Sequence, residues 1–454
     1  MKIESRKVLG LDVSKDNVTC HILDRYPSGG LSKYWRKTAG NRPANYPVFY
    51  SHRPTNKRQK LKLVKDFAQW LEKEKPDFAC MEPTGNHYSR LWYSVLKSFE
   101  IPVLWIGHVE LKRYREGKNL PGKGKNDAVD SLAIAAYPHD PEHHTEDGTL
   151  NLEKFLKHQP DNINLLREKC QQLEHLARVQ NPIVNYARQA LSWQFPEMAQ
   201  SKAAGLFPWL ADMPAECTKR CWGFVDRAYR ESVSPELGIE ISHYLRLHAK
   251  WMVDIQNMES TIEAQVEEIL LAEEFAPYNE VFDLLGFGIR TRARLLSRIY
   301  PFESFLLPNG HLWIEREYRE VKKTKREFEK GTATVKVSAG DVKTIKKTRS
   351  RDLFKMRVGM GTVLESSGDS WIEKSAGSSI CRQSLWLHVL TKVETSRLPN
   401  NPVTKELADY CDMLKSQTDA NGKPLLNGKH IQGKLMAKTA NLMFKEFVKR
   451  FVVR

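Results

Sequence analysis

Short apolar runs alternate with helical patterns along the first 150 residues, and this alternation restricts the fold more than any other feature of the sequence. Runs rich in Val, Leu, Ile and aromatic residues predict strands, and LVKDFAQWLEKEK predicts an amphipathic helix among them. Strands interleaved with helices imply an α/β domain with a mostly parallel or mixed sheet. The predicted strands are KVLGLDVS, VTCHILD, LSKYWRKTA, DFACMEPTG and IPVLWIG.

The alternation stops at a polar stretch, AAYPHDPEHHTEDGTLN, which marks the end of a first domain at residues 1–150. Residues 151–275 show helical apolar repeats that predict a long hairpin packed within the chain or a coiled coil that pairs protomers. Residues 276–454 form a mostly helical third domain that closes with HIQGKLMAKTANLMFKEFVKRFVV, an amphipathic helix with a basic face. The expected fold class is therefore α/β plus mostly α.

The charge of the chain points to a polyanionic partner. Lys and Arg number 71 against 55 Asp and Glu, a net charge of +16, and nucleic acid is the commonest partner of such a surplus. The surplus is dense at about 312–352, where few large apolar residues occur. That segment is either a disordered basic loop or a hairpin that orders on nucleic acid.

Features of targeting and redox state indicate a cytoplasmic protein. No apolar run reaches the roughly eighteen residues that a membrane span needs, and the N-terminus has no signal-peptide pattern. The seven cysteines are scattered without a CxxC pair, which favours reduced thiols over a zinc site.

Four acidic residues stand where strand ends or helix starts would position them. Asp12 interrupts the apolar pattern at the centre of the first strand, and Glu82 follows a later strand. Asp127 and Asp130 share one helical face, where like charges repel. Each acid alone is explained by a cap, a turn or a favourable position on the helix dipole. Together they predict a Mg²⁺ site, because all four donors are oxygens and a cation would relieve their repulsion.

The motifs GLDVSKD, MEPTGNHY and KNDAVD occur in this order and resemble those of the DEDD transposases of bacterial insertion sequences. These are relatives of the Piv-type DNA invertase, and some are bridge-RNA-guided recombinases. The resemblance implies a RuvC-like N-terminal domain of RNase H fold, whose acids Asp12, Glu82, Asp127 and Asp130 bind Mg²⁺ and are catalytic. The last motif reads K-N-D-x-x-D-S where the family has K-T-D-x-x-D-A, and both acids are kept.

A second resemblance lies in GTVLESSGDSWIEKSAGSSICRQSLW, which is similar to the serine-glycine signature of the same family. It implies that Ser367 is the nucleophile that becomes joined to DNA, with Ser366 as the neighbouring candidate. The stretch SSGDS is also ordinary turn chemistry. We expect Lys374 and Arg382 to stabilise developing phosphate charge, and Lys123 and Lys125 to neutralise phosphates near the metal.

The resemblance implies a transposase that cleaves and rejoins DNA through a covalent phosphoserine intermediate. Its implied partners are element-end and target DNA, a non-coding guide RNA, and further copies of the chain in a homodimer or homotetramer in a prokaryotic, nucleoid-associated setting.

The sequence leaves three functions open besides that of a transposase. An RuvC-type endonuclease would use the same acids to hydrolyse DNA with water and would leave the second half without a chemical task. A sugar-kinase-like ATPase would share GLDVSKD but needs a late glycine-rich adenosine motif, which the sequence lacks. A transposase descendant that only binds nucleic acid would have no need to keep the four acids.

Overall fold

The computed structural model describes residues 6–53, 61–83, 88–121, 126–156, 160–320, 325–328, 334–337, 342–367, 370–418 and 424–452. The chain divides into two units, Met1–Gln159 (unit 1) and Pro160–Arg454 (unit 2), and each is described by itself. Unit 1 ends shortly after the predicted end of the first domain at residue 150. The α/β plus α layout is confirmed: unit 1 contains a five-stranded sheet, and unit 2 is mostly helical.

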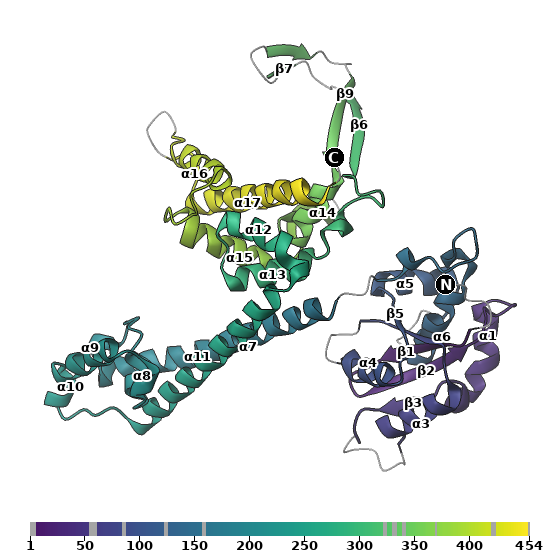
Figure 1. Ribbon diagram of the computed structural model, residues 1–454, viewed down its shortest axis with the longest axis horizontal. Helices are drawn as coiled ribbons and strands as arrows, with labels where there is room; N and C mark the ends of the chain where they lie inside the picture. Colours follow the sequence, from purple (N-terminus) through teal and green to yellow (C-terminus); the bar gives the residue numbers. More distant parts are fainter. Residues whose placement is uncertain are drawn as a thin grey trace. The chain divides into compact units, whose positions relative to one another are not determined.

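The sheet of unit 1 is mixed, with strand order β3-β2-β1-β4-β5, so β1 lies in its middle (Figure 1). β2 runs antiparallel to β1 and to β3, whereas β4 runs parallel to both β1 and β5. The first strand of the sequence is thereby flanked on both sides and buried along its whole length. The strands are β1 (Val8–Val13), β2 (Asn17–Leu23), β3 (Val48–Tyr50), β4 (Phe78–Met81) and β5 (Val103–Trp105).

Helices cover both faces of this sheet. One face, which carries Val8 and Cys80, packs against α1, α5 and α6. The other, which carries Leu9 and Leu11, packs against α3 and α4. Odd and even residues of β1 therefore enter different cores, as the alternation of a strand requires. The helices are α1 (Leu31–Thr38), α2 (Arg42–Asn45), α3 (Val64–Glu74), α4 (Tyr88–Ser98), α5 (His108–Gly117) and α6 (Asp127–Ala136).

One predicted strand is wrong, since LSKYWRKTA forms helix α1. Its buried side chains, Leu31 and Trp35, are four residues apart, which is the repeat of a helix and not of a strand. The strand beside β2 comes instead from β3, which lies in the polar connection that follows α1. The other four predicted strands and the helix of LVKDFAQWLEKEK, now α3, are confirmed.

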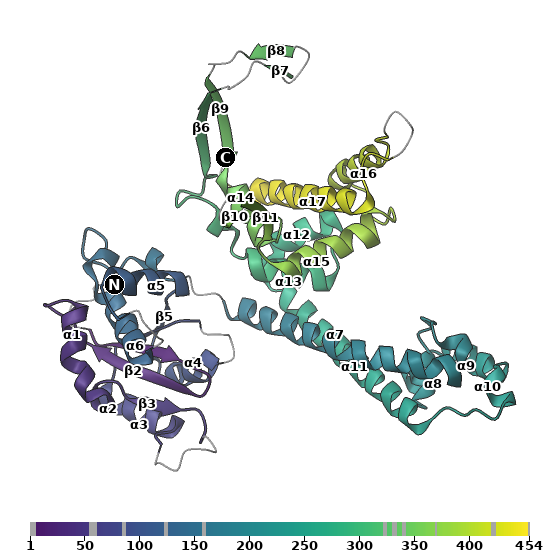
Figure 2. The same ribbon diagram turned by 180° about the vertical axis from the view of Figure 1, so that it is seen from behind.

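Two long helices of unit 2, α7 and α11, pack along each other within the chain (Figure 2). This agrees with the hairpin alternative for the predicted middle segment. At one end of the pair, Phe195, Leu210 and Val225 form a small core with α8 and α9. The helices are α7 (Asp161–Gln194), α8 (Leu206–Leu210), α9 (Lys219–Arg230), α10 (Val233–Glu236) and α11 (His243–Leu270).

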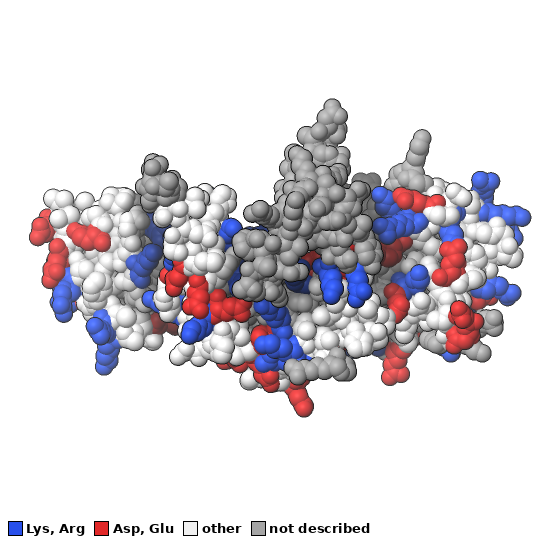
Figure 3. All heavy atoms as spheres, turned by 90° about the horizontal axis from the view of Figure 1, so that it is seen from above, with Lys and Arg blue, Asp and Glu red and all other residues white. Residues whose placement is uncertain are grey.

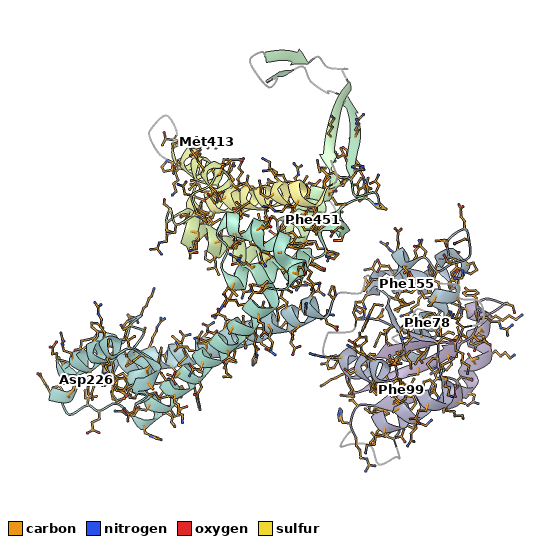
Figure 4. The ribbon with its side chains drawn as sticks, viewed as in Figure 1. Phe78, Phe99, Phe155, Asp226, Met413 and Phe451 are labelled. Atoms are coloured by element: carbon orange, nitrogen blue, oxygen red, sulfur yellow. The ribbon has the colours of Figure 1, made fainter. Side chains whose placement is uncertain are left out.

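The other end of the α7–α11 pair joins the main core of unit 2. Ile163 and Val266 belong to the same apolar cluster as Phe302 and Phe447, so residues on both sides of the predicted boundary at 275/276 share one core. Phe451, marked in Figure 4 at the end of α17, packs against Phe302 with ring centroids 5.3 Å apart. The helices are α12 (Ala276–Leu285), α13 (Ile289–Ile299), α14 (Arg349–Arg357), α15 (Ser379–His388), α16 (Pro402–Lys415) and α17 (Gly428–Phe451).

The basic segment 312–352 contains a hairpin in which β6 pairs antiparallel with β9 (Figure 1). Of the two alternatives that the sequence left, a hairpin agrees with this pairing, and its ordering by nucleic acid stays a prediction. Two further antiparallel pairs are β7 with β8 and β10 with β11. The strands are β6 (Ile314–Glu320), β7 (Lys325–Phe328), β8 (Thr334–Val337), β9 (Val342–Thr348), β10 (Gly361–Ser367) and β11 (Ser370–Ala376).

Two properties of the described residues concern membrane-spanning helices and disulfide bonds. Within the described ranges, no helix combines the length and apolarity needed to cross a membrane. All seven cysteines are free, without a disulfide between them.

On the face drawn in Figure 3, Lys and Arg side chains are interspersed with Asp and Glu. A binding site therefore has to be located from individual side chains and not from net charge.

Candidate metal centre at the carboxyl end of the sheet

Asp12 is a buried acid on the middle strand of unit 1, with 4% of its surface exposed. Alternation along β1 puts Asp12 on the same face as Val8 and Gly10, which is the face covered by α5 and α6. The residue lies one position before the carboxyl end of β1. An apolar strand accepts a carboxylate there only if the environment offsets its desolvation.

Glu82 directly follows β4, the parallel neighbour of β1. The last residue pair of that ladder is Leu11 with Met81, so the next residue on each strand is an acid, Asp12 and Glu82. Glu82 Oε2 lies 3.0 Å from Nδ1 of His108, the first residue of α5. Because α5 covers the Asp12 face, Glu82 lies at that same face and the two acids are neighbours across the strands.

Helix α6 runs antiparallel to β1, as two contacts show. A Cβ on Gly10 would lie 2.3 Å from the carbonyl oxygen of Ser131 and 2.4 Å from the backbone nitrogen of Ala135, so the helix backbone rests on the strand. Just beyond the end of α6, His139 Nε2 lies 3.1 Å from the carbonyl oxygen of Leu23, at the end of β2 beside the start of β1. The first turn of α6 therefore faces the carboxyl end of β1.

The spacing along both elements brings the first turn of α6 level with Asp12. Asp12 is two residues beyond Gly10, or about 7 Å along the strand. Asp130 and Asp127 are three and six residues before the middle of the Ser131–Ala135 contact, or about 4–5 and 9 Å along the helix. The two aspartates of α6 thus bracket the level of Asp12.

The start of α6 holds its two aspartates in different ways. Asn126 caps the helix by accepting a hydrogen bond from Ala128 N at 3.2 Å, and Asp127 is half-buried in the first turn. Asp130 is buried, with 6% of its surface exposed, and forms an ion pair with Arg115 of α5. The helix dipole favours both acids, and Asp130 needs the guanidinium because burial alone would disfavour its charge.

Helix α5 therefore engages two of the four acids. His108 contacts Glu82 and Arg115 pairs with Asp130, and these two residues lie seven positions apart on one face of the helix. Sequence reasoning missed both, since nothing in HVELKRYREG distinguishes a partner of a distant acid from a solvated cation. The only usable signal was that a buried Asp130 must have some partner.

The donor types at this end of the sheet fit Mg²⁺, which prefers carboxylate oxygens. The four acids are not close enough together to form a metal site, because among the described residues no three His, Cys, Asp or Glu side chains are arranged to hold a metal ion. Asp130 in particular is engaged by Arg115. The structure thus brings the four predicted acids to one end of the sheet without forming a closed ligand shell. The predicted phosphate contacts Lys123 and Lys125 lie outside the described residues.

Ser367 belongs to unit 2 and is the last residue of β10, where it pairs with Ser370 of β11. Ser366 precedes it on the same strand, paired with Trp371. The side chains of both serines lie outside the described part, and their backbone places them at the end of a hairpin. The turn that SSGDS predicts falls on residues 368 and 369, which lie outside the described residues.

The base of this hairpin, which is the end opposite to Ser367, is fixed to α14 and α15. Gly377, just after β11, has φ +89°, and a Cβ there would lie 1.7 Å from the carbonyl oxygen of Met356. Arg382 donates from Nε to the carbonyl oxygen of Gly359 at 2.8 Å, which ties α15 to the turn before β10. Arg382, predicted to contact phosphate, thus has a positioning task in this structure. Lys374 lies on β11, opposite Val363.

Comparison with known proteins finds no protein-family model that matches the chain. A search among curated proteins likewise finds no match.

Proposed function

We propose that the chain is a DNA recombinase of the DEDD transposase type, which cleaves DNA and rejoins it through a serine-linked intermediate. One observation carries the proposal: Asp12 is buried on the middle strand, next to Glu82, at the end of the sheet that the first turn of α6 faces. A protein that only binds nucleic acid has no use for buried carboxylates at a strand end. A mixed five-stranded sheet with helices on both faces is compatible with the RuvC-like fold that the motifs imply.

Asp12, Glu82, Asp127 and Asp130 would hold Mg²⁺ in this proposal. The bound ion would supply charge neutralisation at the scissile phosphate and orient it. The residues of the chain then have separate tasks. Asp12 and Glu82 are fixed by adjacent strands, and Asp130 is held by Arg115 until a cation takes the place of the guanidinium.

Ser367 is the proposed nucleophile. Its Oγ forms a bond to the phosphorus of a DNA phosphodiester, the bond from phosphorus to one sugar oxygen breaks, and the released sugar hydroxyl takes up the serine proton. A hydroxyl needs help to react in this way, through a base, a lowered pKa or a more reactive electrophile. The hairpin is anchored at the end opposite to Ser367, and the ladder of β10 with β11 extends from there to the pair of Ser367 with Ser370.

A covalent-adduct assay tests this proposal. The chain is expressed with its native flanking DNA, so that any guide RNA is made, and is mixed with labelled element-end DNA and Mg²⁺. A denaturing gel then shows whether DNA migrates with protein. We expect an adduct in the wild type that is lost in Ser367→Ala and in Asp12→Asn. Ser370→Ala, which changes the cross-strand partner of Ser367, and Asp24→Asn, an exposed acid after β2, are the matched controls.

The second candidate function is a metal-dependent endonuclease that uses water. It is favoured by one observation, namely that the four acids all belong to unit 1 and the serine belongs to unit 2. In the same assay it predicts free cut DNA without an adduct, and cleavage that survives Ser367→Ala. That result would overturn the recombinase proposal while keeping the acidic site.

The proposal includes DNA, a guide RNA and further copies of the chain as partners, in the cytoplasm of a prokaryote. Self-association is supported by Tyr244, Trp251 and Met258, which recur every seven residues along α11 and are 54%, 49% and 47% exposed. Large apolar side chains at this spacing suit pairing of helices between protomers. Sedimentation of the wild type and of Trp251→Glu tests this, since the charged variant should shift the protein toward the monomer.

A further inference from the structure

A groove with a volume of about 510 Å³ lies in unit 2, between α17, α14 and the base of the β6–β9 hairpin. We call it the α17 groove. Its described lining contains four cations and no acid. Leu312, Phe444 and Val448 give it an apolar floor. The cations are Arg351, Lys438, Lys445 and Lys449.

The carboxylates nearest to these cations do not line the groove. Glu406 serves two lysines, with 2.5 Å to Lys438 Nζ and 3.7 Å to Lys445 Nζ. Glu446 pairs with Lys449 and is also shared, with Arg450 at 3.6 Å. Asp352, which lies 3.8 Å from Arg351, does not line the groove either. The four lining cations therefore have three carboxylates beside them, and a surplus of positive charge remains. The side chains of Lys445 and Lys449 are 61% and 58% exposed, so they can move toward a ligand.

The cations of α17 form a row and not a single cluster. Lys438, Lys445 and Lys449 occupy positions i, i+7 and i+11, which lie along one face of a helix. The row is about 16 Å long at the rise of an α-helix. A strand that runs along a row of this length presents more than one phosphate to it. The row therefore suits a polyanion with regular charges better than a single anion.

Asn441 adds a second, independent observation. It lines the same groove, and its Oδ1 is buried without a hydrogen-bond partner in the described part of the chain. An unsatisfied buried acceptor destabilises the folded protein, and such groups in native proteins generally have a reason. A ligand that brings a donor would satisfy it. Nucleic acids carry such donors as base amino groups and, in RNA, the 2′-hydroxyl.

We propose that the α17 groove binds the sugar–phosphate backbone of a nucleic-acid strand. The inference rests on the proposed function in one respect, namely that the protein works on nucleic acid. It adds a specific place, which differs from the acidic end of unit 1 and from the β10–β11 hairpin. The apolar floor would accommodate sugar carbons while the row of cations pairs with successive phosphates.

The test uses the full-length chain and measures fluorescence anisotropy of labelled RNA, single-stranded DNA and duplex DNA across a range of salt concentrations. The variant is Lys438→Gln/Lys445→Gln/Lys449→Gln. Three exposed lysines outside the groove give a control with the same change in charge, Lys405→Gln/Lys415→Gln/Lys429→Gln. Thermal unfolding of both variants checks that each is folded.

We expect the groove variant to bind its preferred probe more weakly and to lower the slope of log affinity against log salt by about 2–3, close to one for each phosphate that the variant no longer neutralises. The control should keep the slope of the wild type. The probe whose affinity falls most identifies the strand as RNA or DNA. Equal affinities and slopes for the groove variant and its control would overturn the inference.

Asn441→Leu separates a ligand contact from a structural role. The change removes the unsatisfied acceptor at similar volume, so the melting temperature should hold or rise. Binding should weaken without a change in salt slope, because the charge of the groove stays the same. If this variant and the triple variant both bind nucleic acid like the wild type while the covalent adduct still forms, the inference about the α17 groove is overturned and the proposed function stands. A wild-type chain that binds none of the probes would instead overturn the proposed function together with the inference.

Discussion

The acidic end of the sheet in unit 1 and the α17 groove in unit 2 carry opposite charges and are built in opposite ways. Asp12 and Asp130 are 4% and 6% exposed and are set on a middle strand and a packed helix. Lys445 and Lys449 have side chains that are 61% and 58% exposed on one helix face. Asp12 and Asp130 are buried on packed elements, whereas Lys445 and Lys449 are largely exposed to solvent.

The difference follows from what each charge has to do. Carboxylates that share a cation must sit within a short distance of one another, so their backbones need to be fixed and their burial offset by partners. Lysines that neutralise a phosphate chain act additively and through flexible side chains. Single substitutions should therefore have large effects at the acidic end and small, additive ones in the groove.

The largest effect is expected for Gly10→Ala. The new Cβ would overlap the backbone of α6 at Ser131 and Ala135, and neither atom belongs to a flexible side chain. We expect the free energy of unfolding of unit 1 to fall by about 3 kcal/mol or more. Calorimetry of the full chain should show one unfolding transition displaced to a lower temperature. Gly40→Ala, where no atom lies within 4 Å of the added Cβ, should change little; similar losses in both variants would mean that α6 does not rest on β1.

The next effect concerns Arg115→Met, which removes the ion pair between Arg115 and the buried Asp130. We expect a loss of about 2–3 kcal/mol in the absence of divalent cations. Mg²⁺ should restore more stability to the variant than it adds to the wild type, because a cation replaces the guanidinium. Melting temperatures with and without Mg²⁺ measure this. Arg113→Met, exposed on the same helix, is the control, and an equal Mg²⁺ shift in all three proteins would argue against a metal at Asp130.

Acid should destabilise unit 1 through its buried histidines. Burial lowers the pKa of His21 to about 4 and also lowers the pKa values of His139 and His143. These rings are neutral in the folded chain, so the unfolded chain binds more protons below about pH 6.5. The stability that these neutral rings contribute is fully present above about pH 6.5 and is lost as the pH falls toward 4, by roughly 3 kcal/mol for His21.

Melting temperatures measured from pH 7 to pH 4 test this expectation. The decline should be shallower in His21→Gln than in the wild type, because one of the protons that drive unfolding has been removed. His52→Gln, whose side chain is 60% exposed, should follow the wild type. Identical curves for all three proteins would mean that folding does not lower the pKa of His21.

The smallest effect is expected in the groove. Lys445→Gln removes an exposed cation whose partner Glu406 lies 3.7 Å away, so the free energy of unfolding should change by less than about 0.5 kcal/mol. Chemical denaturation measures this value. A loss comparable to that of Arg115→Met would remove the contrast between the two regions and would make the groove lysines structural.

The sequence alone determined the features that repeat over short distances. Asp12 stood out because it breaks an apolar strand, Asp127 and Asp130 were predicted to share one face of a helix, and the basic face of α17 was predicted from the pattern of its residues. The error at LSKYWRKTA arose because a short segment rich in aromatic residues fits both a strand and a helix. Burial of Leu31 and Trp35 against α6 decides for the helix.

Only the tertiary structure decided which distant residues meet. It set β1 between β2 and β4, which brings Asp12 beside Glu82, and it brought Arg115 and His108 of α5 onto two of the acids. It also added Arg351 of α14 to the lysines of α17. The physical reason is that propensity and periodicity act over a few residues, whereas packing partners are selected by the fit of whole faces across the chain.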